Sequence, residues 1–210
     1  MFTQEVIRHQ QQDYPDSMRE QEERVAGIII GTHKPCLILT EHPPLYTVGT
    51  SGREGDILSR EIDGESIAVF ASGRGGEVTY HGPGQLVMYV LADLRNDPDL
   101  HQHVHRLEEM VILTLADFGI EGVRSQRGIG VWVKGNKIAA VGVRCRKWIT
   151  FHGIALNINP NLRHFSGIVP CGMRDAPVTS IHAEGVMVSR DEVEVRLLPH
   201  AAALFPGPGG

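Results

Sequence analysis

The sequence predicts an α+β fold built on a mixed or antiparallel sheet, and three observations lead to this prediction. Short apolar runs typical of strands dominate the chain. Residues 129–145 have the pattern of a β-hairpin, with alternating apolar residues on both sides of a Gly135-Asn136 turn. Several amphipathic stretches typical of helices are interspersed among the strands.

The N-terminal segment is expected to form one helix followed by a strand. Residues 13–30 favour a helix, because apolar residues recur on one face and Pro15 suits the first helical position. Gly31 can end this helix, since glycine readily adopts the left-handed conformation of a C-terminal cap. Cys36–Thr40 is a continuous apolar run, which indicates a short buried strand.

The segment after this strand is expected to be irregular at first. Two prolines within residues 41–49 predict an extended entry, so His42 should lie on a loop or at a strand end. Residues 50–65 are rich in glycine and charge, which predicts a surface loop. Ser66–Phe70 then has the composition of a strand.

Residues 74–86, with the sequence RGGEVTYHGPGQL, mix glycines with residues that carry chemistry. Gly75 and Gly76 lack a Cβ atom, so other groups can approach the backbone closely. Gly82-Pro83-Gly84 predicts a turn directly after His81, whose imidazole is expected to face out of that turn. A plain glycine-rich hairpin is the alternative, but this density of constrained polar residues favours a functional loop.

The central part of the chain is expected to contain a buried strand and a helix. Residues 85–94 are apolar at both alternating sets of positions, which is typical of a strand covered on both faces. Apolar residues from Leu100 to Phe118 make one helical stripe that Gly119 can end.

The C-terminal part continues with a strand, a loop and a helix. Residues 148–159 favour the strand, and residues 167–175 form the loop because of their glycine and proline content. Ser189 and Glu192 make a capping box that begins the helix, which Pro199 is expected to kink or end.

Composition limits what the protein can be. With 210 residues, of which 41% are hydrophobic and 21% charged, we expect one globular domain over residues 1–205 and a disordered tail at 206–210. No apolar run has the length of a membrane span, and the N-terminus lacks a signal-peptide core. A net charge of −5 argues against nucleic-acid binding, and three cysteines without a CxxC pair indicate a reducing cytoplasm. No metal site is predicted.

The three cysteines differ in their sequence context. Cys36 lies in an apolar run, and Cys145 continues the alternation of an apolar strand, so both are expected to face the core. Cys171 lies in the loop sequence Pro-Cys-Gly, where small or rigid neighbours would leave its thiol accessible. A nucleophilic cysteine must react as the thiolate, which an adjacent cation favours. A functional Cys171 and an inert loop cysteine both remain open on this reasoning.

Four residues are candidates for activating that thiol: His42, His81, His152 and Lys137. Cysteine–histidine pairs are the commoner arrangement, and most lysines beside hairpin turns are simply solvated. The strand that follows Lys137 is unusual, however, because it consists almost wholly of small and apolar residues. The sequence by itself does not choose among these groups.

Four separated blocks, taken together, resemble the lipoyl(octanoyl) transferases, which are octanoyl-carrier-protein:protein N-octanoyltransferases. They are EHP through Gly49, RGG with TYHGPGQ, KIA through Arg144, and HGIALN followed by Pro170-Cys171-Gly172. The blocks follow the family's order and span about two-thirds of the chain, and the TYHGPGQ and PCG elements are highly specific to it.

This resemblance implies a fold shared with biotin and lipoate protein ligases, in which helices flank a mixed, largely antiparallel sheet. It implies a catalytic dyad in which Cys171 accepts the acyl group and Lys137 lowers the thiol pKa and relays protons. It also implies that the acyl and pantetheine groups bind at Arg74, Gly75, Gly76, Glu77, Val78, Thr79, Tyr80, His81, Ala140, Val141, Gly142, Gly153, Ile154 and Ala155. The small residues among them suit a narrow apolar slot with close backbone walls.

The resemblance further implies the reaction and its partners. An octanoyl or lipoyl group would pass from acyl carrier protein to a lysine of lipoyl domains of 2-oxoacid dehydrogenase complexes and of the glycine cleavage H protein. No cofactor is expected, since a thioester is already activated, and we expect a cytoplasmic monomer. An ATP-dependent lipoate or biotin protein ligase is the alternative enzyme, although adenylation would not use Cys171. A non-catalytic carrier-binding module is a third possibility, although both dyad positions are filled.

Overall fold

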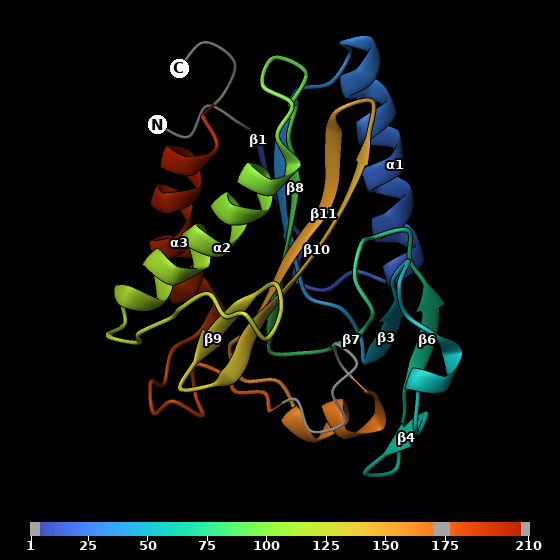
Figure 1. Ribbon diagram of the computed structural model, residues 1–210, viewed down its shortest axis with the longest axis vertical. Helices are drawn as coiled ribbons and strands as arrows, with labels where there is room; N and C mark the ends of the chain where they lie inside the picture. The colour runs from blue at the N-terminus through green and yellow to red at the C-terminus, as the bar shows by residue number, and fades with distance from the viewer. Residues whose placement is uncertain (1–4, 170–176, 207–210) are drawn as a thin grey trace.

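The protein, described over residues 5–169 and 177–206 in a computed structural model, is built on a six-stranded sheet with the strand order β1-β2-β8-β11-β10-β9 (Figure 1). The strands are β1 (Glu5–Arg8), β2 (Cys36–Thr40), β8 (Gln85–Leu91), β9 (Val131–Val133), β10 (Asn136–Arg146) and β11 (Ile149–Asn157). Only β1 and β2 pair in parallel, and the other neighbours are antiparallel. The sheet is therefore mixed and largely antiparallel, as the sequence predicted.

A smaller three-stranded sheet, with the order β6-β3-β7, lies beside the lower end of the main sheet, beneath α1, in Figure 1. Its strands are β3 (Leu45–Val48), β6 (Ala68–Ala71) and β7 (Val78–His81), and β4 (Glu61–Ile62) pairs with β5 (Glu65–Ser66) nearby. Two 3-10 helices, η1 (Glu54–Asp56) and η2 (Leu162–Gly167), complete this region. The two tyrosines Tyr46 and Tyr80 form the centre of its apolar cluster.

Three helices cover the main sheet on opposite faces (Figure 1). Helix α1 (Tyr14–Ile30) packs on one face, and α2 (Leu100–Ala116) and α3 (Arg190–Leu204) pack together on the other. Pro15 and the left-handed Gly31 (φ 82°) bound α1 as predicted. No helix in the described part of the chain is long and apolar enough to cross a membrane.

Several local predictions were wrong, each for an identifiable reason. The hairpin turn consists of Lys134 and Gly135, because Asn136 already pairs with Val133, and both turn residues have positive φ as in a type I′ turn. Helix α3 continues past Pro199 to Leu204. His81 does not face out of a turn; it ends β7 and its side chain is buried.

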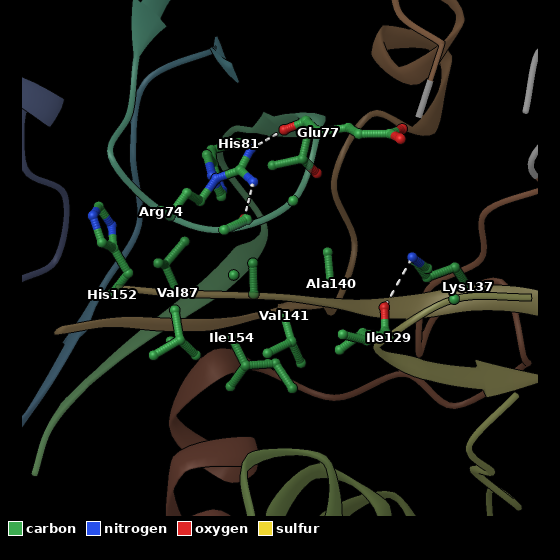
Figure 2. Close-up of a pocket in the computed structure, with 18 of the residues that line it drawn as sticks. Arg74, Glu77, His81, Val87, Ile129, Lys137, Ala140, Val141, His152 and Ile154 are labelled. Atoms are coloured by element: carbon green, nitrogen blue, oxygen red, sulfur yellow. Dashed lines mark hydrogen bonds between the residues drawn. The ribbon is translucent and has the colours of Figure 1, made fainter. Parts of the chain in front are cut away.

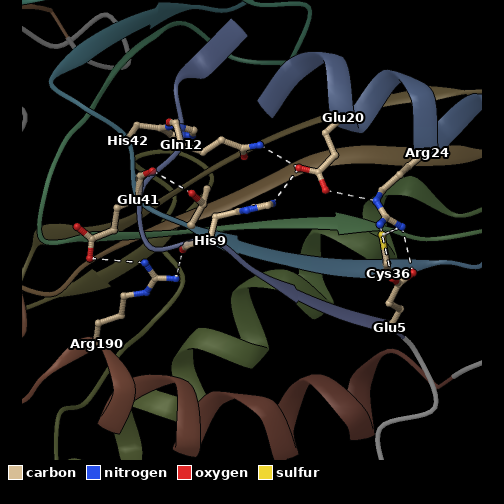
Figure 3. A network of polar contacts seen from close by, with 10 residues as sticks. Glu5, His9, Gln12, Glu20, Arg24, Cys36, Glu41, His42 and Arg190 are labelled. Carbon is tan, nitrogen blue, oxygen red and sulfur yellow. Dashed lines mark hydrogen bonds and ion pairs between the residues drawn. The ribbon is translucent and has the colours of Figure 1, made fainter. Parts of the chain in front are cut away.

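The N-terminal segment was not predicted to form a strand, and polar contacts hold it in place (Figure 3). The Glu20 carboxylate accepts hydrogen bonds from His9 and Gln12 and pairs with Arg24. On the other side, the Arg190 guanidinium donates to the backbone carbonyls of His9 and Gln10. These contacts fix the segment from β1 to α1 along the edge of the sheet, beside His42.

Candidate functional site

A cavity of about 460 Å³ lies where the loop at residues 74–76 covers strands β10 and β11 (Figure 2). Four small residues face each other across these strands: Ala140 pairs with Ala155, and Gly142 pairs with Gly153. Val87, Val141 and Ile154 are among the apolar residues that line it. The absence of bulky side chains at the paired positions produces a narrow apolar slot with backbone close to its contents.

At two positions of this slot, neighbouring atoms leave no room for a side chain, so only glycine fits. A Cβ atom at Gly153 would collide with the backbone carbonyl oxygen of Met88. A Cβ atom at Gly142 would lie 2.8 Å from Cδ of Arg74 and 3.1 Å from the carbonyl oxygen of Gly75. Gly142 therefore lets the glycine-rich loop lie directly on the strand, where Gly75 N–H donates to the carbonyl of Val143 over 2.8 Å.

Arg74 holds the loop in shape from inside. Its buried guanidinium donates to the hydroxyl and carbonyl of Thr47, over 2.8 Å each, and to the carbonyls of Gly75 and Glu77. Bonds from a charged donor are stronger than those between neutral groups, so this side chain links the loop firmly to β3. Figure 2 shows Arg74 above the strands, on the wall of the cavity.

His81 belongs to a chain of hydrogen bonds that runs toward Lys137. Its Nδ1–H donates to Oε1 of Gln85 over 2.7 Å, and the Gln85 amide donates to Oδ1 of Asn157. The Asn157 amide in turn donates to the carbonyl of Thr179, whose N–H donates to the carbonyl of Lys137. A buried, fully connected chain of this kind fixes the relative positions of its members.

The three candidate histidines are neutral near pH 7. Burial lowers the pKa of His42 to about 4 and the pKa of His81 to about 3. Burial, assisted by the charges of Arg74 and Arg144, lowers the pKa of His152 to about 3. None of them can therefore supply the imidazolium that a cysteine–histidine ion pair requires.

A fourth buried histidine, His103 on α2, lies outside the cavity and contacts Phe205 edge-on at 5.5 Å. Burial lowers its pKa to about 4, and neither ring nitrogen has a hydrogen-bond partner among the described residues.

The four buried histidines make stability depend on pH. A histidine in the unfolded chain takes up a proton near pH 6.5, whereas these four in the folded protein resist protonation until about pH 3–4. The unfolded state therefore binds more protons as pH falls below 6.5.

We expect the free energy of unfolding to fall as pH decreases from 6.5 toward 4, by about 1.4 kcal/mol per pH unit for each such histidine. Urea denaturation at several pH values measures this slope. His103→Leu removes one titrating group and one buried polar ring, so its slope should be shallower than that of the wild type. Equal slopes in the two proteins would contradict the buried neutral state of His103.

Lys137 lies at one end of the cavity, opposite His152 in Figure 2. Its Nζ donates to the carbonyl of Ile129 over 3.1 Å and lies 4.9 Å from the ring centre of Trp132. Its backbone N–H donates to the carbonyl of Pro177. This hydrogen bond joins β10 to the segment that starts at Pro177, six residues after Cys171 in the sequence.

The cysteines within the described residues are poor nucleophiles. Cys36 is fully buried, and burial raises its pKa to about 11. Cys145 is half-buried rather than fully inward-facing, and desolvation raises its pKa as well. Cys171 lies outside the described residues, as does most of the predicted 206–210 tail.

The structure brings most of the predicted binding residues to this cavity. Its lining includes residues 74–79, His81, residues 140–142 and residues 153–155. Tyr80 is the exception: its ring packs in the cluster of the small sheet, and its hydroxyl bonds to Nδ1 of His164 over 2.8 Å. Gln85, one of the polar residues of the glycine-rich stretch that the sequence marked as functional, also lines the cavity. Sequence reasoning did not select Tyr14, Tyr89, Asn157 and Val178, which line it as well.

The family model for the lipoyl protein ligase A/B catalytic domain matches residues 13–202. The chain belongs to this family. An octanoyltransferase from Paramagnetospirillum magneticum is 48% identical over 200 residues, which cover 92% of this chain and 91% of that protein. One from Rhodospirillum rubrum is 47% identical over 198 residues, covering 91% and 90%. Identity of this degree over most of both chains makes the protein an acyltransferase.

Solved structures agree with the fold. A putative lipoate protein ligase from T. acidophilum superposes with a TM-score of 0.72 at 18% identity, covering 95% of this chain and 85% of that one. The biotin protein ligase from Aquifex aeolicus superposes with a TM-score of 0.57 at 15% identity, covering 98% and 70%. At such identities the likeness concerns the fold alone, and it confirms the predicted fold, which lipoate and biotin protein ligases share.

Proposed function

We propose that this acyltransferase moves an octanoyl or lipoyl group from acyl carrier protein to a specific lysine of lipoyl domains, through a thioester on Cys171. The acceptors would be lipoyl domains of 2-oxoacid dehydrogenase complexes and the glycine cleavage H protein. The observation that carries the proposal is the apolar slot with Lys137 at one end, in a chain 48% identical to an octanoyltransferase. We further propose one catalytic domain over residues 1–205, acting as a monomer in the cytoplasm without a cofactor.

Three observations support Cys171 and Lys137 as the reactive pair. The other two cysteines have raised pKa values and are disfavoured as thiolates. The histidines near the cavity are neutral, so a cation must come from a basic side chain such as Lys137, which lines the cavity near Arg127. The backbone bridge between Lys137 and Pro177 joins β10 to the segment that follows Cys171.

The proposed reaction has two acyl transfers. The Cys171 thiolate attacks the thioester carbonyl and the bond to the pantetheine sulfur breaks. The carrier leaves as a thiol after taking a proton from the Lys137 ammonium, which becomes neutral. The lysine amine of the lipoyl domain then attacks the acyl-enzyme, and Cys171 leaves as the thiolate. The proton that this amine loses is accepted by Lys137 in its neutral form. Since the acyl group arrives as a thioester, no ATP is consumed.

An ATP-dependent lipoate or biotin protein ligase is the second candidate, because the fold is shared with such enzymes. Incubation of the protein with octanoyl-acyl carrier protein and an apo lipoyl domain, with and without ATP, separates the two. We expect octanoylated lipoyl domain in both reactions. A strict requirement for ATP would favour the ligase, and no transfer in either reaction would favour a non-catalytic carrier-binding module.

The small residues of the slot provide a further test. In Gly142→Ala the new methyl group meets Cδ of the anchored Arg74 side chain and the carbonyl oxygen of Gly75, so it displaces the loop and alters the slot, and KM for octanoyl-pantetheine should rise by about tenfold or more. Melting temperature and KM are both measured, with Gly153→Ala as the matched comparison. There the methyl group meets the Met88 carbonyl, so stability should fall by about 1–3 kcal/mol. An unchanged KM in a folded Gly142→Ala protein would contradict acyl binding at this position.

A further inference from the structure

The two ends of the cavity differ in character. Lys137 marks one end, Val87, Val141 and Ile154 lie between, and His152 lies at the opposite end (Figure 2). His152 is 2% exposed, and its Nε2 atom is buried without a hydrogen-bond partner among the described residues. Buried polar atoms of folded proteins are nearly always paired, so this unpaired nitrogen makes this end of the cavity polar and unfavourable for an apolar group.

The backbone is strained to put His152 at this place. Its φ of 59° lies in the left-handed region, which residues other than glycine rarely adopt and which is concentrated at functional sites. Phe151 and His152 stack with 19° between their rings, so two consecutive side chains of β11 share one face instead of alternating. The Gln21 side chain of α1 accepts the His152 N–H over 2.8 Å and holds this conformation.

Two tyrosines complete this polar end. The Tyr89 ring contacts His152 at 6.2 Å, and its hydroxyl donates to Nε2 of His42 over 2.6 Å. His42 accepts there because its Nδ1–H donates to the carbonyl of Gln12. The buried Tyr14 hydroxyl also lines the cavity, and it makes no hydrogen bond of good geometry within the described part of the chain.

We propose that this polar end, formed by His152, Tyr14 and Tyr89, limits the length of the acyl chain by its polarity and not by its bulk. The inference rests on the proposed acyl-binding function of the cavity. Each added methylene gains from burial while it contacts Val87, Ala140 and Ala155, which share the face of the sheet that the loop covers. A chain that extends as far as the His152 ring and the Tyr14 hydroxyl must press an apolar end against buried polar atoms that it cannot bond, and so loses affinity.

Two substitutions of His152 separate polarity from bulk. His152→Phe keeps a ring of similar size but removes both ring nitrogens. His152→Asn enlarges the cavity but keeps a polar group, and asparagine tolerates the positive φ. If polarity sets the limit, His152→Phe accepts longer chains and His152→Asn does not. If bulk sets the limit, His152→Asn accepts longer chains and His152→Phe does not.

The probes are S-alkyl pantetheine thioethers with octyl, decyl and dodecyl chains, whose binding is measured by calorimetry without any chemical step. We expect the wild type to bind the octyl compound at least about tenfold more tightly than the dodecyl compound. His152→Phe should remove most of this preference, and His152→Asn should keep it. A preference that survives in His152→Phe, or that is lost in His152→Asn alone, would overturn the proposal.

Tyr14→Phe provides a second, independent variant, because it removes a buried hydroxyl from the same end without touching the strained strand. It should weaken the preference for octyl over dodecyl in the same direction, and an unchanged preference would count against the proposal if His152→Phe does not fold. The proposed function is tested separately, by octanoyl transfer to an apo lipoyl domain in the wild type. Failure of that transfer with an intact chain-length profile would refute the function and leave the polar limit standing.

Discussion

Cys171→Ala should abolish transfer of octanoyl groups to an apo lipoyl domain, lowering the rate by about a thousandfold or more, because the variant lacks the nucleophile. Transfer is measured as octanoylated lipoyl domain formed from octanoyl-acyl carrier protein. Cys36 and Cys145 cannot replace the lost thiol, since burial raises the pKa of each. A residual rate within tenfold of the wild type would contradict a covalent role for Cys171.

Cys145→Ala is the matched control for this prediction. Cys145 is half-buried near the end of β10 and does not line the cavity, so its replacement should leave transfer close to the wild-type rate. A loss in Cys145→Ala equal to that in Cys171→Ala would show that removing either thiol damages the protein, and the assignment would then fail.

Lys137→Met should raise the pKa of the Cys171 thiol by about one unit or more, because it removes the cation that we place beside the thiolate. Alkylation of Cys171 by iodoacetamide at pH 7 should then slow by about tenfold, and octanoyl transfer should fall by about a hundredfold or more. The rate of alkylation as a function of pH, measured by peptide mass spectrometry, gives the thiol pKa directly.

Lys137→Arg separates the charge of this residue from its proton transfer. The guanidinium keeps the positive charge but does not lose a proton at ordinary pH, so alkylation should stay fast while transfer is lost. Unchanged alkylation in Lys137→Met would show that another group activates the thiol, despite the neutral state of His42, His81 and His152.

Local sequence patterns were sufficient to predict the helices and strands whose own residues define their ends. β2 was predicted residue for residue, and α1 within one residue, because an apolar run and a proline–glycine pair define them. β1, β3 and β7 were harder to predict. Their sequences are short, and they become strands only by pairing with distant partners, such as Glu5 with Cys36.

The candidate site was predicted as a set of residues but not as an arrangement. The small residues of β10 and β11 were identified, whereas their direct pairing across the two strands is a matter of register. The neutrality of the histidines could not be predicted, because it follows from burial by elements far away in the sequence. Likewise, the tripeptide Phe151-His152-Gly153 contains no feature that predicts the left-handed backbone conformation of His152.

Intact mass spectrometry of the wild-type protein after mixing with octanoyl-acyl carrier protein is the most direct test of a Cys171 thioester. We expect one added octanoyl group, mapped by peptide analysis to Cys171, which disappears on addition of an apo lipoyl domain as that domain gains the same mass. An adduct located on Cys36 or Cys145, or one that the lipoyl domain does not remove, would contradict a Cys171 thioester as the reaction intermediate.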